Sequence, residues 1–503
     1  MKKFDKSFEE VYSENYKKEL SGLDFLSFQP LDNDLFVFAT DFIKKEKAYK
    51  VYGAKVNQTD GTLQNEFIEM GSYERESKKD DFEAKLESIN NKQNFLLVCD
   101  LTGKNNTRLA VTVLDKNLKQ QSTTNIVLSF LPGFYTLQDV KLVNNTIVVL
   151  GRSFEEVAWK RKRKKKVFKK FELSLYALDG TKLKDISLER ENKFTLEGRL
   201  LELNGNQVAL AGLYSDDAKK KKLNGFFIDK VDITTGLLTV SSTKPITEDM
   251  IGKNFTDEAD DDDDDDESKK AKKEKEKAQK NDDVDELPNQ YKIKEILINP
   301  TDGSFIISAE ISEINVFTYY TSDASGLGSG TPTTVYEFTN KDIILICADN
   351  KGAIKWLNAI PKKQFESNSR VYRSIIGFDI ESDYYGYFSR SGGMPFLSSF
   401  SSAIINNKLI LLYNDHRTNA VIANYGDKVK SISNFKKKGE LFAMSFDIAT
   451  GKATKKSIAS CADDDVITMP RHAMVIGNTF IVPAWRQRAL GKTIFKIAEV
   501  TVK

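Results

Sequence analysis

Short apolar segments alternate with tight polar turns along most of this chain. Segment 342–361 (DIILICADNKGAIKWLNAIP) is typical, because two apolar runs of strand length flank the turn at 349–352. Runs rich in Ile, Val, Phe and Tyr that are bounded by Asn, Asp and Gly predict strands joined by hairpin turns. The pattern therefore predicts an all-β protein.

Two kinds of hairpin recur in a fixed order. The first kind has an Asn- or Gly-bearing turn just before an apolar strand, and Asn and Gly tolerate the positive φ angles that short hairpins need. Its seven copies begin near residues 32, 90, 144, 204, 302, 406 and 477. The second kind follows each of the first six, with turns at 59–61, 115–117, 179–180, 235–236, 350–352 and 450–451.

Two hairpins in series form a four-stranded antiparallel sheet, and seven such units in tandem predict a seven-bladed β-propeller. Six or eight blades are the alternative counts. A pair of stacked sheets would explain the strands but not the two-hairpin period. We assign 23–503 to the propeller and 1–22 to an N-terminal extension. The last unit lacks one strand, which residues 8–16 are expected to supply unless they form a short capping helix.

The turn at 349–352 resembles the repeat of quinoprotein-like propellers, in which Asp, Gly and Trp dock neighbouring blades. Asp349, Gly352 and Trp356 match that repeat after Ala348, whereas the turns at 232–236 and 447–451 match without the Trp. The resemblance implies that these three residues join blades. The Lys- and Asn-rich, Cys-poor composition also resembles that of Bacteroidota propeller proteins. A quinone-dependent oxidoreductase is suggested only by fold analogy.

The long connections all fall between the second and third strands of a unit or between units. Because neighbouring strands run in opposite directions, these connections share one rim, and loops on a rigid scaffold often carry binding residues. Tolerance of insertions on that rim alone would give the same pattern. The insertions are 152–166, 215–222, 242–289, 313–338, 362–395, 416–438 and 460–469.

Aromatic and basic residues accumulate on this predicted rim. Tyr and Arg dominate binding hot spots, so we predict a protein partner, with a glycan as second choice. Packing of the same aromatic residues onto their own rim is the alternative. The predicted binding residues are Arg370, Tyr372, Arg373, Tyr384, Tyr385, Tyr387, Phe388, Arg390, Arg417, Arg471, Trp485 and Arg486.

The charge balance gives no general attraction to nucleic acid or membrane, since 75 Lys and Arg face 73 Asp and Glu. The basic block at 160–166 is interpreted as a solvated hairpin tip. Segment 256–286 contains the acidic run 260–266 and too little apolar surface to fold, so we expect it to be disordered. We expect no nucleic-acid partner.

Candidate catalytic chemistry is sparse. His416 and His472 are the two histidines, and they are weak candidates for acid–base catalysis. An enzyme acting on glycan or peptide at the channel mouth is therefore the alternative to a non-enzymatic scaffold. Cys99, Cys347 and Cys461 lack metal-binding spacing and are expected to be buried free thiols. We predict no metal and no cofactor.

The N-terminal segment lacks the apolar core of a signal peptide, and no apolar run approaches the roughly 20 residues of a membrane span. We therefore expect a cytoplasmic monomer without a transmembrane segment. A periplasmic or cell-surface location is the alternative if a leader has been removed.

Overall fold

The computed structural model describes residues 1–5, 9–78, 80–89, 93–103, 106–128, 133–159, 163–190, 193–203, 205–216, 222–247, 250, 291–321, 331–371, 395–486 and 494–502. These residues form eight antiparallel sheets, of which one has two strands and seven are larger. We number the larger sheets 1 to 7 along the chain. No helix in this part of the chain is long and apolar enough to cross a membrane.

Sheets 1 to 4 each have four strands in sequence order. Sheet 1 contains β3 (Asp24–Leu31), β4 (Asp34–Ile43), β5 (Ala48–Val56) and β6 (Ile68–Glu74). Sheet 2 contains β7 (Asp81–Ile89), β8 (Asn94–Thr102), β9 (Thr107–Leu114) and β10 (Gln120–Leu128). Sheet 3 contains β11 (Tyr135–Val143), β12 (Thr146–Trp159), β13 (Arg163–Ala177) and β14 (Lys182–Leu188). Sheet 4 contains β15 (Phe194–Glu202), β16 (Gln207–Ser215), β17 (Gly225–Asp232) and β18 (Leu237–Pro245).

Sheets 5 to 7 are more elaborate. Sheet 5 contains β19 (Tyr291–Ile298), β20 (Phe305–Thr321), β21 (Thr331–Ala348) and β22 (Ile354–Ile360), and β23 (Gln364–Val371) also pairs with β21. Sheet 6 contains β24 (Phe400–Ile405), β25 (Lys408–His416), β26 (Gly439–Asp447) and β27 (Ala453–Ser460), with helix α3 (Phe435–Lys438) before β26. In sheet 7, β28 (Ile467–Thr468) and β29 (Met474–Ile476) flank the short helix η3 (Pro470–His472) and pair with β30 (Thr479–Arg486), which also pairs with β31 (Ile494–Thr501).

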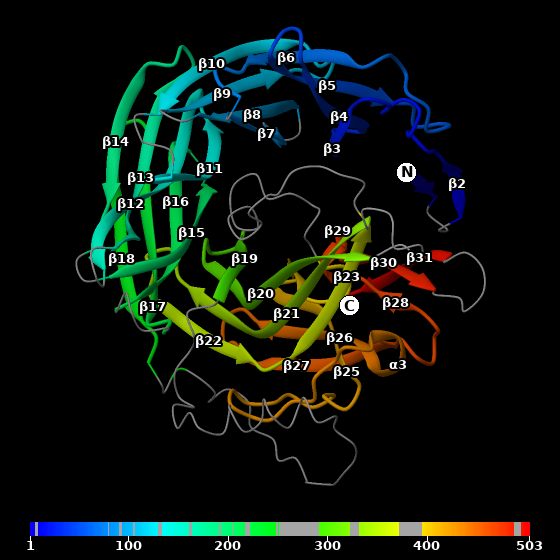
Figure 1. Cartoon of the computed structure of the whole chain (residues 1–503). Coiled ribbons are helices and arrows are strands. Elements are labelled where there is room, and N and C mark those ends of the chain that lie inside the picture. Colours follow the sequence, from blue (N-terminus) through cyan, green and yellow to red (C-terminus); the bar gives the residue numbers. More distant parts are fainter. Residues whose placement is uncertain are drawn as a thin grey trace.

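The larger sheets follow one another around a ring, and β3, β7, β11, β15 and β19 lie on its inner side (Figure 1). The prediction of an all-β propeller is therefore confirmed. The number of blades and the division into an extension and a propeller domain remain predictions.

Asparagine and glycine occupy the tight turns for the expected conformational reason. Asn406 and Asn407 between β24 and β25 have φ angles of 50° and 57°, and Gly451 between β26 and β27 has 74°. Few residue types adopt these left-handed conformations without strain. The turn residues thus fix where each strand reverses.

The hydrophobic core lies between consecutive sheets rather than at the centre of the ring. Separate clusters of buried apolar side chains join sheets 1 and 2, 2 and 3, 3 and 4, 4 and 5, 5 and 6, and 6 and 7. Among the described residues, no such cluster joins sheet 7 to sheet 1. Apolar side chains buried between consecutive sheets therefore hold the ring together, except at the junction of sheets 7 and 1, where the two ends of the chain meet.

A second contact recurs at the periphery, where an outer strand touches the turn of the following sheet. Trp356 on β22 donates its indole N–H to the carbonyl oxygen of Ile448 at 2.7 Å, and a Cβ on Gly451 would lie 2.7 Å from the Trp356 ring. Lys184 on β14 donates to Thr235 O at 3.0 Å in the same way. In both cases, an outer strand is hydrogen-bonded to a turn of the following sheet.

The predicted docking residues occupy two successive junctions of this kind. Gly352 lies against Ser242 of β18, whereas Trp356 reaches sheet 6. Asp349 holds the intervening turn, because its Oδ1 accepts the backbone N–H groups of Lys351 and Ala353, each at 2.8 Å.

Replacing Trp356 with phenylalanine should lower the free energy of unfolding by about 2 kcal/mol, because the buried Ile448 O then loses its N–H donor and keeps only the weak contact with Cys347 Sγ. Thermal and urea denaturation of the variant would measure the loss. Phe446, whose ring stacks on Trp356 at 6.2 Å, keeps its aromatic neighbour, so a loss below about 0.5 kcal/mol would show that the hydrogen bond does not contribute to docking.

The two-stranded sheet of β1 (Lys2–Phe4) and β2 (Glu10–Ser13) lies on sheet 1, at the gap between the chain ends. Tyr16 donates its hydroxyl hydrogen to Gly61 O, and a Cβ on Gly61 would lie 2.4 Å from the Tyr12 ring. Gly61 belongs to the turn of sheet 1 that corresponds to Gly451 in sheet 6. The hairpin thus contacts sheet 1 as an outer strand of a preceding sheet would.

The same hairpin also reaches sheet 7, because the Phe4 and Phe495 rings have their centroids 5.8 Å apart. No described strand pairs with the outer edge of β31. The predicted segment 8–16 therefore includes strand β2, which pairs with β1 rather than with sheet 7.

Candidate functional site

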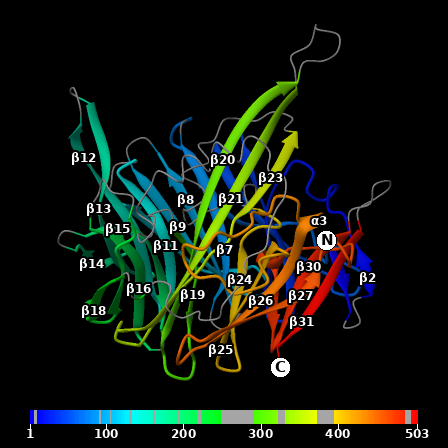
Figure 2. The same ribbon diagram turned by 90° about the horizontal axis from the view of Figure 1, so that it is seen from below.

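The rim that carries the long connections has two large projections. Figure 2 shows the β12–β13 hairpin and the strands β20, β21 and β23 extending from the same side of the ring. Strand β23 pairs with the first half of β21, from Gln364 opposite Asn340 to Val371 opposite Thr333. We call residues 313–321, 331–340 and 364–371 the rim extension.

The predicted insertions at 313–338 and 362–395 contribute strands to this rim extension. Residues 313–321 of β20 and 364–371 of β23 both pair with β21. Tyr336 and Phe338 are buried with their rings stacked at 6.4 Å, whereas Val316 and Phe317 are 36% and 45% exposed. The extension therefore has its own small core and also presents apolar side chains to solvent.

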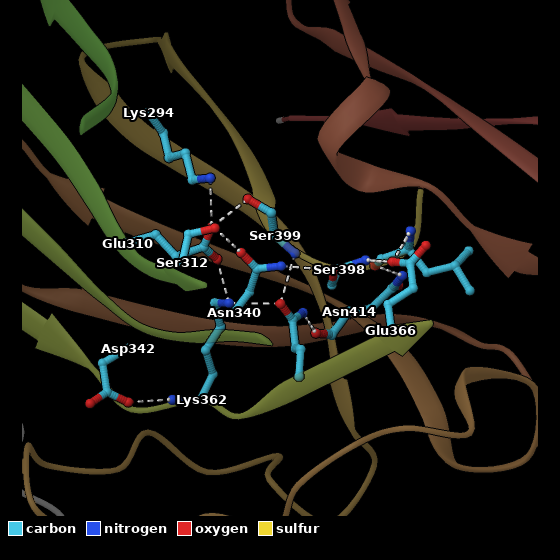
Figure 3. A network of polar contacts seen from close by, with 12 residues as sticks. Lys294, Glu310, Ser312, Asn340, Asp342, Lys362, Glu366, Ser398, Ser399 and Asn414 are labelled. Carbon is cyan, nitrogen blue, oxygen red and sulfur yellow. Dashed lines mark hydrogen bonds and ion pairs between the residues drawn. The ribbon is translucent and has the colours of Figure 1, made fainter. Parts of the chain in front are cut away.

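A network of buried polar groups lies at the base of the rim extension (Figure 3). Lys362 Nζ lies 2.5 Å from Glu310 Oε1, and both side chains are completely buried. Glu310 Oε2 accepts a hydrogen bond from Ser399 Oγ at 2.6 Å and lies 3.3 Å from Lys294 Nζ. One carboxylate thus joins strand β20 to β19, to the end of sheet 5 and to the start of sheet 6.

Each member of this ion pair stabilises the charged form of the other, which offsets the cost of burying both charges. Burial alone would raise the pKa of Glu310, but the charges of Lys362 and Lys294 lower that pKa. Burial lowers the pKa of Lys362, and attraction from Glu310 opposes that change. Removal of either partner would leave a buried charge without its counter-ion, which is strongly destabilising.

A second carboxylate fastens the chain on the far side of segment 372–394. Glu366 on β23 accepts backbone N–H groups from Phe396, Leu397 and Ser398, each at 2.8 Å. Gln364 Oε1 accepts the Ser399 N–H at 2.7 Å. Strand β23 and residues 396–399 are therefore held together at the two ends of this segment.

Amide side chains extend the network toward both neighbouring sheets. Asn340 accepts a hydrogen bond from Ser312 Oγ and donates one to Ser398 Oγ, both at 2.8 Å. Asn414 on β25 donates to Leu397 O at 2.9 Å and to Thr468 O of sheet 7 at 2.8 Å. The network thus spans sheets 5, 6 and 7.

The structure brings the predicted binding residue Trp485 and the catalytic candidate His472 together through Phe396. The Phe396 ring lies 6.0 Å from the His472 ring and 6.0 Å from the Trp485 ring. Trp485 also packs against a small apolar cluster that includes Leu397 and Phe435. These rings cover the network on the side of sheet 7.

The three predicted arginines on sheets 6 and 7 are placed separately. Arg417 is exposed beyond the end of β25, and Arg471 is half-buried in η3. Arg486 Nε lies 2.5 Å from Asp465 Oδ2, which fixes its position at the rim.

The two histidines have different surroundings, although β25 and η3 pack against each other. His416 Nδ1 accepts the Thr418 backbone N–H at 3.3 Å, whereas His472 Nε2 donates to Pro395 O at 3.2 Å. Burial lowers the pKa of both imidazoles, with repulsion from Lys438 adding to the effect at His416. Burial thus favours the neutral form of each ring, and each ring makes its own local hydrogen bond.

Several predicted features lie outside the described residues. The side chain of Arg370 is one of them, although its backbone pairs with Thr334 in the sheet. Segment 256–286 and the side chains of the basic block 160–166 are others. The remaining residues of this kind are Tyr372, Arg373, Tyr384, Tyr385, Tyr387, Phe388 and Arg390.

Cysteine and metal predictions concern the rest of the molecule. Cys99, Cys347 and Cys461 are buried and free, as predicted. Across the described ranges, no three His, Cys, Asp or Glu side chains gather in a way that could hold a metal ion.

Sequence reasoning missed Glu310, Lys362, Gln364 and Glu366, which form the centre of the network. Lys362, Gln364 and Glu366 were assigned to an insertion, where polar residues are unremarkable. The available signal was Glu310, a carboxylate directly after the apolar run FIISA. Such a residue predicts a buried partner, but only the fold identifies Lys362 as that partner.

No protein-family model and no curated protein matches this chain. Among solved structures, the β-propeller domain of the trilobed protease from Pyrococcus furiosus is 6% identical with a TM-score of 0.35, and the match covers 95% of this chain and 97% of that one. A Synechocystis ACO variant is 9% identical with a TM-score of 0.32, covering 86% and 71%. At this level of similarity, the fold assignment rests on the sheet order described above.

Proposed function

We propose that this protein is a non-enzymatic scaffold that holds a protein partner on the rim extension and on segment 372–394. The observation that carries the proposal is the buried network that fastens both ends of this segment. It supports the earlier assignment of the rim as the binding face. The chain itself is proposed to be a monomer.

The energetic character of the network favours a positioning role. Desolvation of a buried ion pair costs several kcal/mol, and packed apolar residues often give equal or greater stability. A fold needing only stability could therefore use apolar side chains at Glu310 and Lys362. Fixed hydrogen-bond directions, by contrast, hold the residues at the two ends of segment 372–394 in place, which reduces the entropy lost when a partner binds.

The exposed surface of the rim extension supports a protein partner. Val316 and Phe317 are adjacent on β20, so their side chains point to opposite faces of the strand. The segment that follows β23 contains the predicted Tyr and Arg residues, which are the types enriched in protein-binding hot spots. Apolar, aromatic and basic groups would together form the contact.

The test is replacement of residues 373–393 with a Gly-Ser linker, leaving 362–371 and 395–399 in place. A deletion of the whole insertion at 362–395 would also remove Lys362 and Glu366 and would unfold the network. We expect the trimmed chain to fold normally but to recover at least about tenfold less partner from an extract of the source cells, since losing a hot spot costs 2 kcal/mol or more.

A matched control replaces residues 218–221, which belong to another insertion of the same rim. That variant should recover the partner as the intact chain does. Phe317→Ser provides an independent point change, with an expected loss of about fivefold or more. Equal recovery by the intact and trimmed chains would contradict the proposal.

A further inference from the structure

Four cationic side chains gather where the inner strands of sheets 4 and 5 approach sheet 3. They are Arg152 on β12, Arg199 on β15, and Lys292 and Lys294 on β19. Glu197 joins the two inner strands, because its Oε2 accepts the Ile293 N–H at 2.9 Å and its Oε1 lies 3.1 Å from Arg199 Nη2. We call these four residues the cationic cluster.

Arg152 is attracted by Glu197, but part of its guanidinium lacks a hydrogen-bond acceptor. Its Nε is buried, and no described residue accepts a hydrogen bond from it. The guanidinium lies over the Phe168 and Phe154 rings, at 5.0 Å and 5.6 Å from their centroids. A buried N–H group without an acceptor is costly, so this position favours an additional anion.

The charges around Arg152 point the same way. Glu197 contacts Arg199 and attracts Arg152 and Lys292, whereas Glu310, which lies 3.3 Å from Lys294 Nζ, also pairs with Lys362. Burial lowers the pKa of Lys292, and repulsion from Arg152, Arg199 and Lys294 adds to the effect against attraction from Glu197. Three cations of the cluster therefore share the carboxylate of Glu197.

Solvent can reach the cluster, since the side chains of Arg199 and Lys294 are 33% and 15% exposed. Guanidinium groups bind planar or tetrahedral oxyanions through two parallel N–H donors, and lysine adds a flexible ammonium. We propose that the cationic cluster binds a small doubly charged oxyanion, either a phosphate group or a dicarboxylate. The site includes no residue of the rim extension or of segment 372–394 and does not depend on the proposed partner.

Isothermal titration of the full chain with inorganic phosphate and, separately, with succinate tests the proposal. We expect saturable binding of at least one of the two anions. Arg152→Gln should weaken it by about tenfold or more, because a hydrogen bond to a charged group is lost. Arg152→Lys keeps the positive charge but cannot donate two parallel hydrogen bonds, so this variant should bind the anion with intermediate affinity.

Lys55→Gln is the matched control, because Lys55 is a half-buried cation of sheet 1 that pairs with Asp34 at 2.6 Å. It should bind the anion as the intact chain does. Circular dichroism and thermal melting establish that each variant is folded, and Lys292→Gln provides a second change if Arg152→Gln does not fold. Absence of saturable binding to the intact chain, or equal binding by folded Arg152 or Lys292 variants, would overturn the proposal.

Discussion

Removal of residues 1–15 should lower the free energy of unfolding by about 4 kcal/mol and should promote self-association. The deletion removes Met1, Phe4 and Tyr12, three half-buried side chains that each contribute on the order of 1–2 kcal/mol by leaving water. It also removes the contact of Phe4 with Phe495 on β31, whose outer edge no described strand pairs, and open strand edges tend to pair with other chains. Calorimetry and light scattering would measure the two effects.

The physical argument is that the β1–β2 hairpin closes the ring. Every other junction between consecutive sheets has a shared apolar cluster, whereas the junction of sheets 7 and 1 has the contacts of this hairpin instead. Phe4→Ala should reproduce part of the loss, because Phe4 contacts Phe495. Lys17→Ala, at an exposed position of the same extension, should leave stability unchanged. Wild-type stability after truncation would show that the ring needs no such closure.

Replacing Glu310 with leucine should lower the free energy of unfolding by about 4 kcal/mol. The change leaves the fully buried ammonium of Lys362 without its carboxylate and removes the acceptor of Ser399 Oγ. Breaking a buried ion pair by removing one partner typically costs 3–5 kcal/mol. Urea denaturation, followed by both circular dichroism and tryptophan fluorescence, would measure the loss.

A double-mutant cycle separates the charge effect from simple loss of packing. The double variant Glu310→Leu/Lys362→Met removes both charges and should recover at least half of the lost stability, since an apolar pair of similar volume is often as stable as a buried ion pair. Additive losses in the two single variants would show that Glu310 and Lys362 do not act as a pair.

If the network positions the rim segment, the double variant should separate stability from binding. It would regain stability while binding the partner more weakly than the intact chain, because Lys362 no longer holds Gln364 at 2.7 Å. Restored binding together with restored stability would assign the network a purely structural role.

Much of the fold could be predicted from the chain because hairpin turns are local. The φ angles at Asn406, Asn407 and Gly451 depend on residues at the turn itself, and they mark strand reversals in the printed sequence. The docking of outer strands was recognised only at Trp356, where it has a sequence signature. Lys184 makes an equivalent contact with Thr235, but no residue type at these positions predicts it.

The amino-acid sequence by itself determined the strands, the tight turns, the repeated unit and the rim on which long connections fall. These properties follow from backbone preferences and from alternation over a few residues. Only the tertiary structure decided that Glu310 meets Lys362, that Glu366 binds the backbone at 396–398, and that the buried Nε of Arg152 lacks an acceptor. Such contacts join residues from different strands and sheets, so their energies depend on a geometry that exists only once the ring has assembled.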